Sequence, residues 1–171
     1  MRVLTTVLVL LICFSVQGQD KVFPDDYVGV YKGDLVIINE NGQQNVGMEF
    51  HLQATDSIHT FDYKLVYASG SKPMEKVYKL IIKDRSKGEF MVDENNGILL
   101  NANYFNNTLY SVFQVRNSLI TTTETFYEDR MEFKIVFSNM SDNVIVDGEE
   151  NTVQVTNYPV SVIQKAVLIK Q

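Results

Sequence analysis

The sequence is poor in cysteine, tryptophan and proline. Its one cysteine, Cys13, lies in an apolar stretch near the first residue; tryptophan is absent, and only three prolines occur among 171 residues. Disulfides are therefore excluded as the source of stability, which must come from the hydrophobic core. Lysine and arginine number 15 against 21 aspartates and glutamates. This acidic balance, without basic clusters, argues against a nucleic acid or an anionic membrane surface as a partner.

Long apolar runs are also missing, with one exception. Residues 3–14 are almost wholly apolar, Arg2 precedes them, and Val16-Gln17-Gly18 follows. A positive residue, an apolar run and small residues in this order are typical of a secretory signal peptide. The run is shorter than the roughly 20 residues that cross a bilayer. We therefore predict a signal peptide over residues 1–18, no membrane-spanning segment, and a secreted or periplasmic location.

Apolar residues do not recur at the spacing of a helix. Instead, apolar and polar residues alternate with period two. Asn96-Gly97 between two such segments is a strong signal for a tight hairpin. Residues 138–152 are mostly polar and predict the longest loop. We expect about ten strands, at residues 28–38, 46–55, 60–68, 75–84, 88–93, 98–104, 108–116, 118–126, 130–137 and 158–169.

Short connections between successive strands favour an antiparallel meander. A twisted sheet of about ten strands tends to close or to split in two, because exposed edges invite aggregation. We therefore predict an all-β fold: a single domain over residues 28–171 that forms an up-and-down antiparallel barrel. A lead-in over residues 19–27 precedes it, which we expect to be loose as far as Pro24. The alternative architecture is a two-sheet β-sandwich.

The first predicted strand carries the sequence Gly29-Val30-Tyr31-Lys32-Gly33. It resembles the opening Gly-x-Trp motif of lipocalin and calycin barrels, in which the aromatic ring closes the base of the barrel. The resemblance implies that Gly29, Tyr31 and Gly33 close the barrel here, with tyrosine in place of tryptophan. Lipocalins also pack a basic residue from the end of the last strand over that ring. This sequence departs from that pattern, because no arginine follows Arg130 and only Lys165 and Lys170 are left there.

The number of strands is also similar to that of fatty-acid-binding and nitrobindin-like barrels. Nitrobindin-like barrels bind haem through a histidine late in the chain, whereas both histidines here, His51 and His59, are early. The likeness therefore carries over no haem ligand, and we predict no cofactor. The chain is most similar to the uncharacterised bacterial lipocalin-like families.

A barrel of this size has an interior that can hold a small molecule. Aromatic residues on strands, together with a stripe of threonines, are the candidates to line it. The alternative is that the aromatic rings fill the core and that the threonines reflect β propensity on a half-exposed face. The predicted lumen residues are Tyr63, Tyr67, Tyr104, Phe113, Thr121, Thr123 and Thr125, and Tyr78 belongs to the same group.

Catalytic and metal-binding signatures are not found. The sequence has no Gly-x-Ser-x-Gly elbow, no phosphate loop, and no metal-ligand spacing of its two histidines. Asn106 and Asn139 begin glycosylation sequons, which matter only in a eukaryotic secretory pathway. We predict a secreted lipocalin-like barrel, not an enzyme, that binds a small apolar or amphipathic molecule. The alternatives are a structural or protein-interaction module with a packed interior, and an enzyme that uses carboxylates at the barrel mouth.

Overall fold

The computed structural model describes residues 21–68, 72–147 and 154–171, so the predicted signal peptide lies outside the described residues. Within them, no helix is both long and apolar enough to cross a membrane. The elements, in chain order, are the 3-10 helix η1 (Asp25–Tyr27), β1 (Gly29–Asn39), β2 (Gly42–Ala54), β3 (Thr60–Ala68), β4 (Met74–Asp84), the 3-10 helix η2 (Arg85–Lys87), β5 (Glu89–Asp93), β6 (Leu99–Phe105), β7 (Thr108–Val115), β8 (Ser118–Phe126), β9 (Arg130–Asn139), β10 (Val144–Asp147), β11 (Gln154–Asn157) and β12 (Val160–Lys170).

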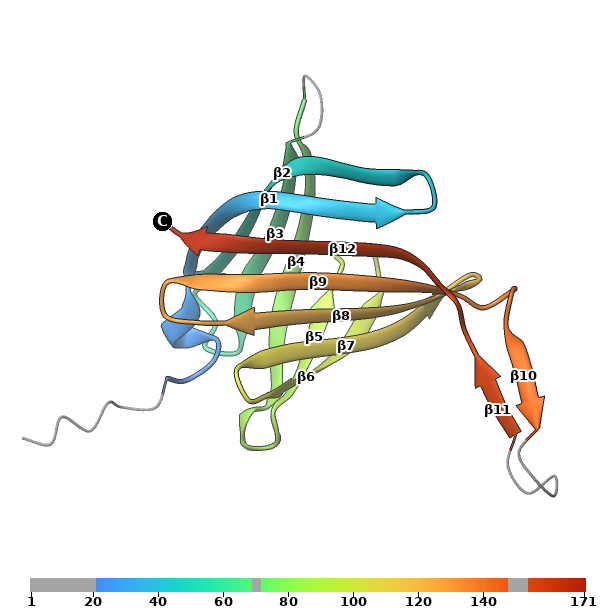
Figure 1. Ribbon diagram of the computed structural model, residues 1–171. Coiled ribbons are helices and arrows are strands. Elements are labelled where there is room, and N and C mark those ends of the chain that lie inside the picture. Colours follow the sequence, from blue (N-terminus) through green and yellow to red (C-terminus); the bar gives the residue numbers. More distant parts are fainter. Residues whose placement is uncertain (1–20, 69–71, 148–153) are drawn as a thin grey trace, which may run out of the picture.

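Ten of these strands form a closed antiparallel barrel, in the order β1-β12-β9-β8-β7-β6-β5-β4-β3-β2 (Figure 1). The predicted all-β barrel is confirmed, and the sandwich alternative is not found. The barrel closes where β1 pairs with β12 from Tyr31↔Lys170 to Asn39↔Val162. Closure pairs the first strand of the meander with the last, so neither is left as a free edge.

The predicted long loop over residues 138–152 is wrong in one respect. The structure places two short strands between β9 and β12, and β10 pairs with β11 as a hairpin that projects from the barrel (Figure 1). Val144, Ile145 and Val146 supply the β-forming residues of the first strand.

The core follows from the alternation of side chains along each strand, because every second residue points into the barrel. The largest fully buried side chains come from many strands of the barrel and belong to one core cluster. They are Tyr31, Leu35, Met48, Phe50, Leu52, Leu80, Phe126, Met131, Phe133 and Leu168, together with Pro24 from the lead-in.

Tyr31 lies at the closed end and has no exposed surface. Its hydroxyl donates a 2.6 Å hydrogen bond to the backbone carbonyl of Tyr27, and its ring meets Phe50 edge-on at 5.9 Å between centroids. The ammonium of Lys170, at the end of β12, lies 5.7 Å from the centroid of the Tyr31 ring. The seam between β1 and β12 thus places a lysine ammonium over the ring of Tyr31.

The glycines that flank Tyr31 allow β1 and β12 to approach each other. A Cβ atom at Gly33 would lie 2.4 Å from the backbone oxygen of Val167, which is too close for any side chain. Gly29 has a φ of +154°, and a Cβ there would lie 2.8 Å from Cε of Lys170. The spacing Gly-x-Tyr-x-Gly thus reflects where the barrel seam is tightest.

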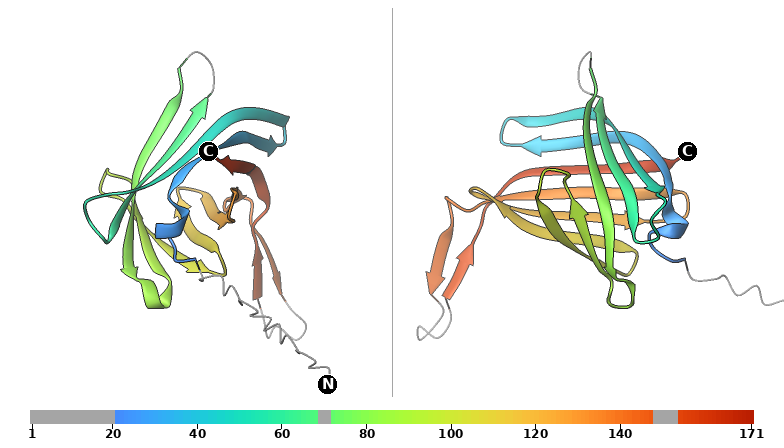
Figure 2. Two further views of the ribbon diagram at one scale, coloured as in Figure 1. Left: turned by 90° about the vertical axis from the view of Figure 1, so that its left-hand side faces the viewer. Right: turned by 180° about the vertical axis from the view of Figure 1, so that it is seen from behind.

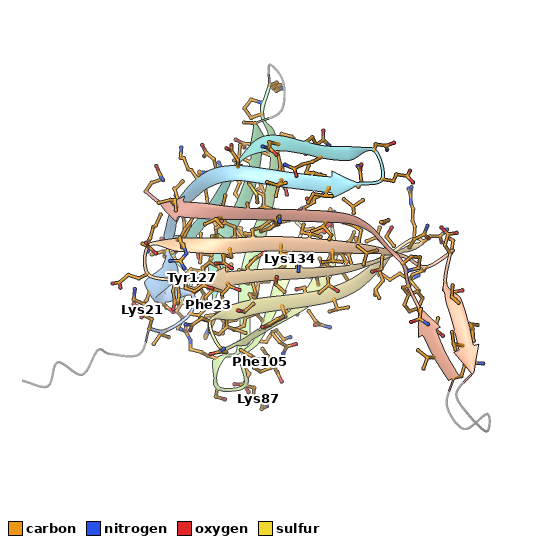
Figure 3. The ribbon with its side chains drawn as sticks, viewed as in Figure 1. Lys21, Phe23, Lys87, Phe105, Tyr127 and Lys134 are labelled. Atoms are coloured by element: carbon orange, nitrogen blue, oxygen red, sulfur yellow. The ribbon has the colours of Figure 1, made fainter. Side chains whose placement is uncertain are left out.

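Where the structure describes the lead-in, from residue 21 onward, it packs against the barrel, contrary to the expectation of a loose segment as far as Pro24. Phe23 and Tyr27 are each 3 % exposed, and η1 lies across the end of the barrel (Figures 2 and 3). The Phe23 ring stacks on Tyr104 with 4.2 Å between centroids. Arg85 donates a 2.9 Å hydrogen bond to the Phe23 carbonyl and forms an ion pair with Asp25. The segment therefore plugs the closed end, although its local composition is polar.

Candidate functional site

A cavity of about 130 Å³ lies inside the barrel, away from the plugged end. Its volume is close to that of an engineered apolar cavity of about 150 Å³ that holds benzene. The space therefore suits a molecule of about one ring. The side chains that line it are Tyr63, Leu65, Tyr67, Tyr78, Val92, Glu94, Leu100, Leu109, Ser111, Phe113, Thr122, Glu124, Phe133 and Ile135.

Glu124 is the most unusual side chain of this cavity. It is only 4 % exposed, and one carboxylate oxygen, Oε1, accepts a hydrogen bond from the Tyr63 hydroxyl. The other oxygen, Oε2, is buried and has no hydrogen-bond partner within the described part of the chain. Burial raises the pKa of Glu124 to about 7, although the hydrogen bond from Tyr63 opposes that rise. A buried acceptor without a partner costs folding free energy.

Three tyrosines line the cavity together with this carboxylate. The rings of Tyr63 and Tyr78 lie 5.6 Å apart between centroids, on paired residues of β3 and β4. Tyr67 follows on β3, four residues after Tyr63 and on the same face. Burial raises the pKa of all three phenols above the usual value, so they are neutral at physiological pH. They contribute aromatic rings and hydroxyl groups to the cavity lining, but no charge.

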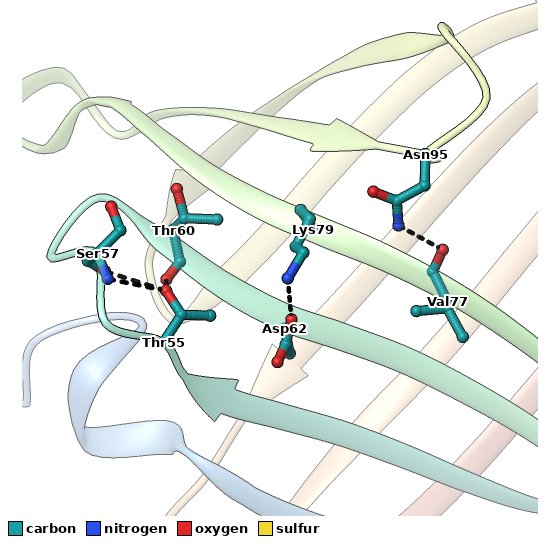
Figure 4. A network of polar contacts seen from close by, with 7 residues as sticks. All are labelled: Thr55, Ser57, Thr60, Asp62, Val77, Lys79 and Asn95. Carbon is teal, nitrogen blue, oxygen red and sulfur yellow. Dashed lines mark hydrogen bonds and ion pairs between the residues drawn. The ribbon is translucent and has the colours of Figure 1, made fainter.

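A second carboxylate, that of Glu94, lies at the turn between β5 and β6. Its backbone N–H donates a 3.0 Å hydrogen bond to the carbonyl of Ile98, and Asn96 donates to its side chain at 3.1 Å. Asn95, whose φ is positive, donates from its side chain to the carbonyl of Val77 at 2.9 Å (Figure 4). This bond ties the turn to β4, next to Tyr78. The predicted Asn-Gly hairpin is thus also what places Glu94 at the cavity.

The charge of the lining residues has one sign. Two of the fourteen are carboxylates, and none is a lysine, arginine or histidine. His51 instead forms a 2.8 Å contact with Glu49 on the outer face of β2, and Glu49 also pairs with Lys32. The ion pair of Asp62 with Lys79 belongs to the outer face as well (Figure 4). The interior site is therefore aromatic and anionic.

Of the predicted lumen residues, Tyr63, Tyr67, Phe113 and the associated Tyr78 line the cavity. Tyr104 does not, because it packs against Phe23 in the plug at the closed end. That these four residues bind a ligand remains a prediction.

Thr121, Thr123 and Thr125 do not line the cavity, and their expected inward orientation is wrong by one residue. In the register of β8 with β7, Glu124 pairs with Leu109 and Thr122 pairs with Ser111, and these four side chains line the cavity. Strand alternation therefore turns the odd-numbered threonines to the outer face. There the Thr125 hydroxyl lies 2.9 Å from that of Thr108.

The sequence did contain a signal for the correct orientation. Of the large apolar residues of β8, Ile120 and Phe126 are buried, whereas Leu119, of the opposite parity, is only partly buried. Glu124 and Thr122 are separated from Ile120 and Phe126 by even numbers of positions. Strand alternation therefore places all four side chains on the same, inward face. Glu124 was missed because an acidic residue in a strand is normally expected on the outside, and Glu94 was missed because it lies in a turn.

A larger hollow of about 710 Å³ lies between the β1–β2 turn and the start of β12. It is open to solvent, and none of its lining side chains is buried. The chain segments described here contain no group of three or more His, Cys, Asp or Glu that could hold a metal ion. The interior cavity is therefore the better candidate for a binding site.

Comparison with known proteins adds support for the fold. No family model matches the sequence, and no curated protein matches it. The structure is similar to the crystal structure of a protein of unknown function, of the DUF3598 family, from Nostoc punctiforme. The TM-score is 0.56 at 12 % sequence identity, over 86 % of this chain and 48 % of that protein. The chain thus spans about half the length of this neighbour, and the likeness shows a shared barrel fold.

Proposed function

We propose that this protein is an exported, lipocalin-like barrel that binds a small molecule of about one ring in its interior. The observation that carries this proposal is the unpartnered Oε2 atom of Glu124, which is buried beside a cavity. An unsatisfied buried acceptor destabilises the fold, whereas an apolar side chain of similar shape would not. A carboxyl with a raised pKa in an apolar pocket is typical of a functional site.

The volume of the cavity limits the size of the ligand. Pockets for drug-sized molecules measure about 300–1,000 Å³, whereas this cavity measures about 130 Å³. The cavity would hold only part of a long fatty acid or a haem. The proposed ligand is therefore a compact amphipathic molecule with one apolar ring and one polar group.

The proposal of export rests on the leader pattern of residues 1–18. The mass of the mature protein, recovered from its natural source, tests this part separately. We expect the first residues to be removed near Gly18 and the protein to be found outside the cytoplasm. An intracellular protein that retains residue 1 would contradict it.

Binding is tested by blocking the cavity from one strand. Ser111 lines the cavity and is 7 % exposed, whereas its neighbour Val112 points outward and is 63 % exposed. Ser111→Phe should fill the space, and Val112→Phe is the matched control. The probes are three single-ring compounds, benzyl alcohol, benzylamine and benzoate, followed through the NMR signals of the tyrosine rings. Thermal unfolding shows whether each variant is folded. If Ser111→Phe does not fold, the smaller substitution Ser111→Leu takes its place.

At least one probe should shift the signals of Tyr63, Tyr67 or Tyr78 in the wild type and in Val112→Phe. The same probe should leave them unchanged in the Ser111 variant, because the space is occupied. If no ring compound shifts these signals in the wild type, the proposed function is wrong.

The hairpin of β10 and β11 favours a second candidate, an interaction module. Val144, Ile145, Val146 and Val155 are each 47–57 % exposed on it. Exposed apolar clusters often mark partner surfaces. Val144→Ser combined with Val146→Ser should then abolish self-association or partner binding in sedimentation experiments, while the cavity still binds its probe. The enzyme alternative stays a prediction, with Glu94 and Glu124 as its carboxylates.

A further inference from the structure

We infer that the ligand is a small organic ammonium ion, a protonated amine attached to one ring, with its ammonium group on Glu124 and its ring among Tyr63, Tyr67 and Tyr78. This inference rests on the proposed function, that the cavity binds a small molecule. It goes further in naming the chemical class of that molecule. Four independent features of the cavity carry it.

The first feature is charge. Glu94 and Glu124 are both lining residues, and the lining contains no cationic side chain. Lys76, which continues the inward alternation of β4 beyond Tyr78, is exposed and does not line the cavity. An anionic ligand would therefore meet two carboxylates and no counter-charge, whereas a cation would be attracted by both.

The second feature is the unused acceptor. Oε2 of Glu124 has no partner in the described structure, so it is free to accept a hydrogen bond from a donor group of the ligand. An ammonium group supplies three N–H donors and a charge, and charge-assisted hydrogen bonds are about twice as strong as neutral ones. Ser111 and Thr122, paired on β7 and β8, offer two hydroxyl oxygens for the remaining donors.

The third feature is the set of aromatic faces. Tyr63, Tyr67 and Tyr78 line one side of the cavity, from β3 and β4. The face of a phenol ring attracts a cation electrostatically, and the attraction is largest where water is excluded. A carboxylate beside several aromatic rings is thus suited to an ammonium ion, and the same rings pack against the ligand's own ring.

The fourth feature is size. A cavity of about 130 Å³ holds roughly one benzene ring by comparison with the engineered cavity. An aminomethyl group adds two heavy atoms, which can extend toward Glu124. A polyamine or a long-chain amine would fit into it only in part. Benzylamine is therefore a suitable probe.

The test compares the three probes that differ only in their polar group. Isothermal titration of the wild type at pH 8 should give benzylamine at least about tenfold higher affinity than benzyl alcohol, and no measurable binding of benzoate. Glu124→Gln keeps the shape and the acceptor for Tyr63 but removes the charge. The variant should bind the amine and the alcohol about equally. Glu49→Gln, on the outer face, is the matched control and should keep the wild-type preference.

The pH dependence gives a second readout. An alkyl ammonium stays protonated below about pH 9, as a lysine does. The titratable groups that line the cavity with Glu124 are Tyr63, Tyr67 and Tyr78, which stay neutral, and Glu94 at the β5–β6 turn. Benzylamine affinity should therefore fall below about pH 7, where Glu124 becomes protonated, and level off above it. This dependence should vanish in Glu124→Gln.

The outcomes separate the two proposals. If benzyl alcohol binds the wild type as tightly as benzylamine, the ammonium inference is wrong while the cavity remains a binding site. A Glu124→Gln protein that is folded and still prefers the amine would overturn the inference in the same way. If none of the three probes binds, both proposals fail. The comparison of probes on the wild type needs no variant, so a misfolded variant does not leave the inference untested.

Discussion

The buried carboxyl of Glu124 should make the stability of this protein fall as the pH rises. Its pKa is raised from 4.5 to about 7 by burial in the fold. Between these values the unfolded chain releases the proton while the folded chain keeps it. Because the unfolded state then binds fewer protons, the free energy of unfolding decreases with pH over this window. Below pH 4.5 and above about pH 7 the contribution of Glu124 is constant.

The size of the effect follows from the two pKa values. Each pKa unit corresponds to about 1.4 kcal/mol, so the wild type should lose roughly 3 kcal/mol between pH 4 and pH 8 through this group. The Glu124→Gln variant lacks this loss. Its free energy of unfolding relative to the wild type should therefore increase by about 3 kcal/mol over the same range.

Urea unfolding at several pH values, followed by near-ultraviolet circular dichroism, measures this difference. All other titrating groups are common to both proteins and cancel in the subtraction. Glu49→Gln is a control of opposite sign, because hydrogen bonds from Lys32 and His51 lower the pKa of Glu49. That variant should lose stability relative to the wild type as the pH rises through the acidic range. A Glu124→Gln difference that is flat with pH would refute the reasoning.

Two further predictions concern the closure of the barrel. Gly33→Ala should destabilise the protein by about 1–3 kcal/mol, since its Cβ would lie 2.4 Å from the Val167 oxygen; a change within 0.5 kcal/mol in urea unfolding would contradict this. Phe23→Ala should cost about 3–5 kcal/mol by emptying the plug, whereas Val22→Ala, at a position 46 % exposed, should cost less than about 0.5 kcal/mol. Equal melting temperatures for these two variants would mean that the lead-in does not close the barrel.

The strands of the barrel could be predicted because each has its own alternation and a turn signal at its end. The β10–β11 hairpin escaped prediction because its two strands have four residues each and pair only with each other. The lead-in escaped because Phe23 is followed closely by Asp25 and Asp26, whose charge suggests exposure. Its burial depends on rings from distant strands, such as Tyr104 on β6.

The site could be predicted only in part, and the reason is physical. On β3, Tyr63 and Tyr67 alternate with Asp62, Lys64 and Val66, so the charged residues show which face is outside. Residues 121–125 of β8 are polar on both faces, so alternation there carries no information about which face is inside. The orientation is fixed by packing at the two ends of the strand.

The most direct test of a binding site at Glu124 is the pKa of its carboxyl, measured by NMR titration of the side-chain carboxyl carbon. The structure predicts a value near 7 for the protein alone. Addition of benzylamine should lower the pKa, because an ammonium ion on Oε2 favours the charged form. A carboxyl that titrates near 4.5 in the protein alone, or that does not respond to the amine, would contradict the account.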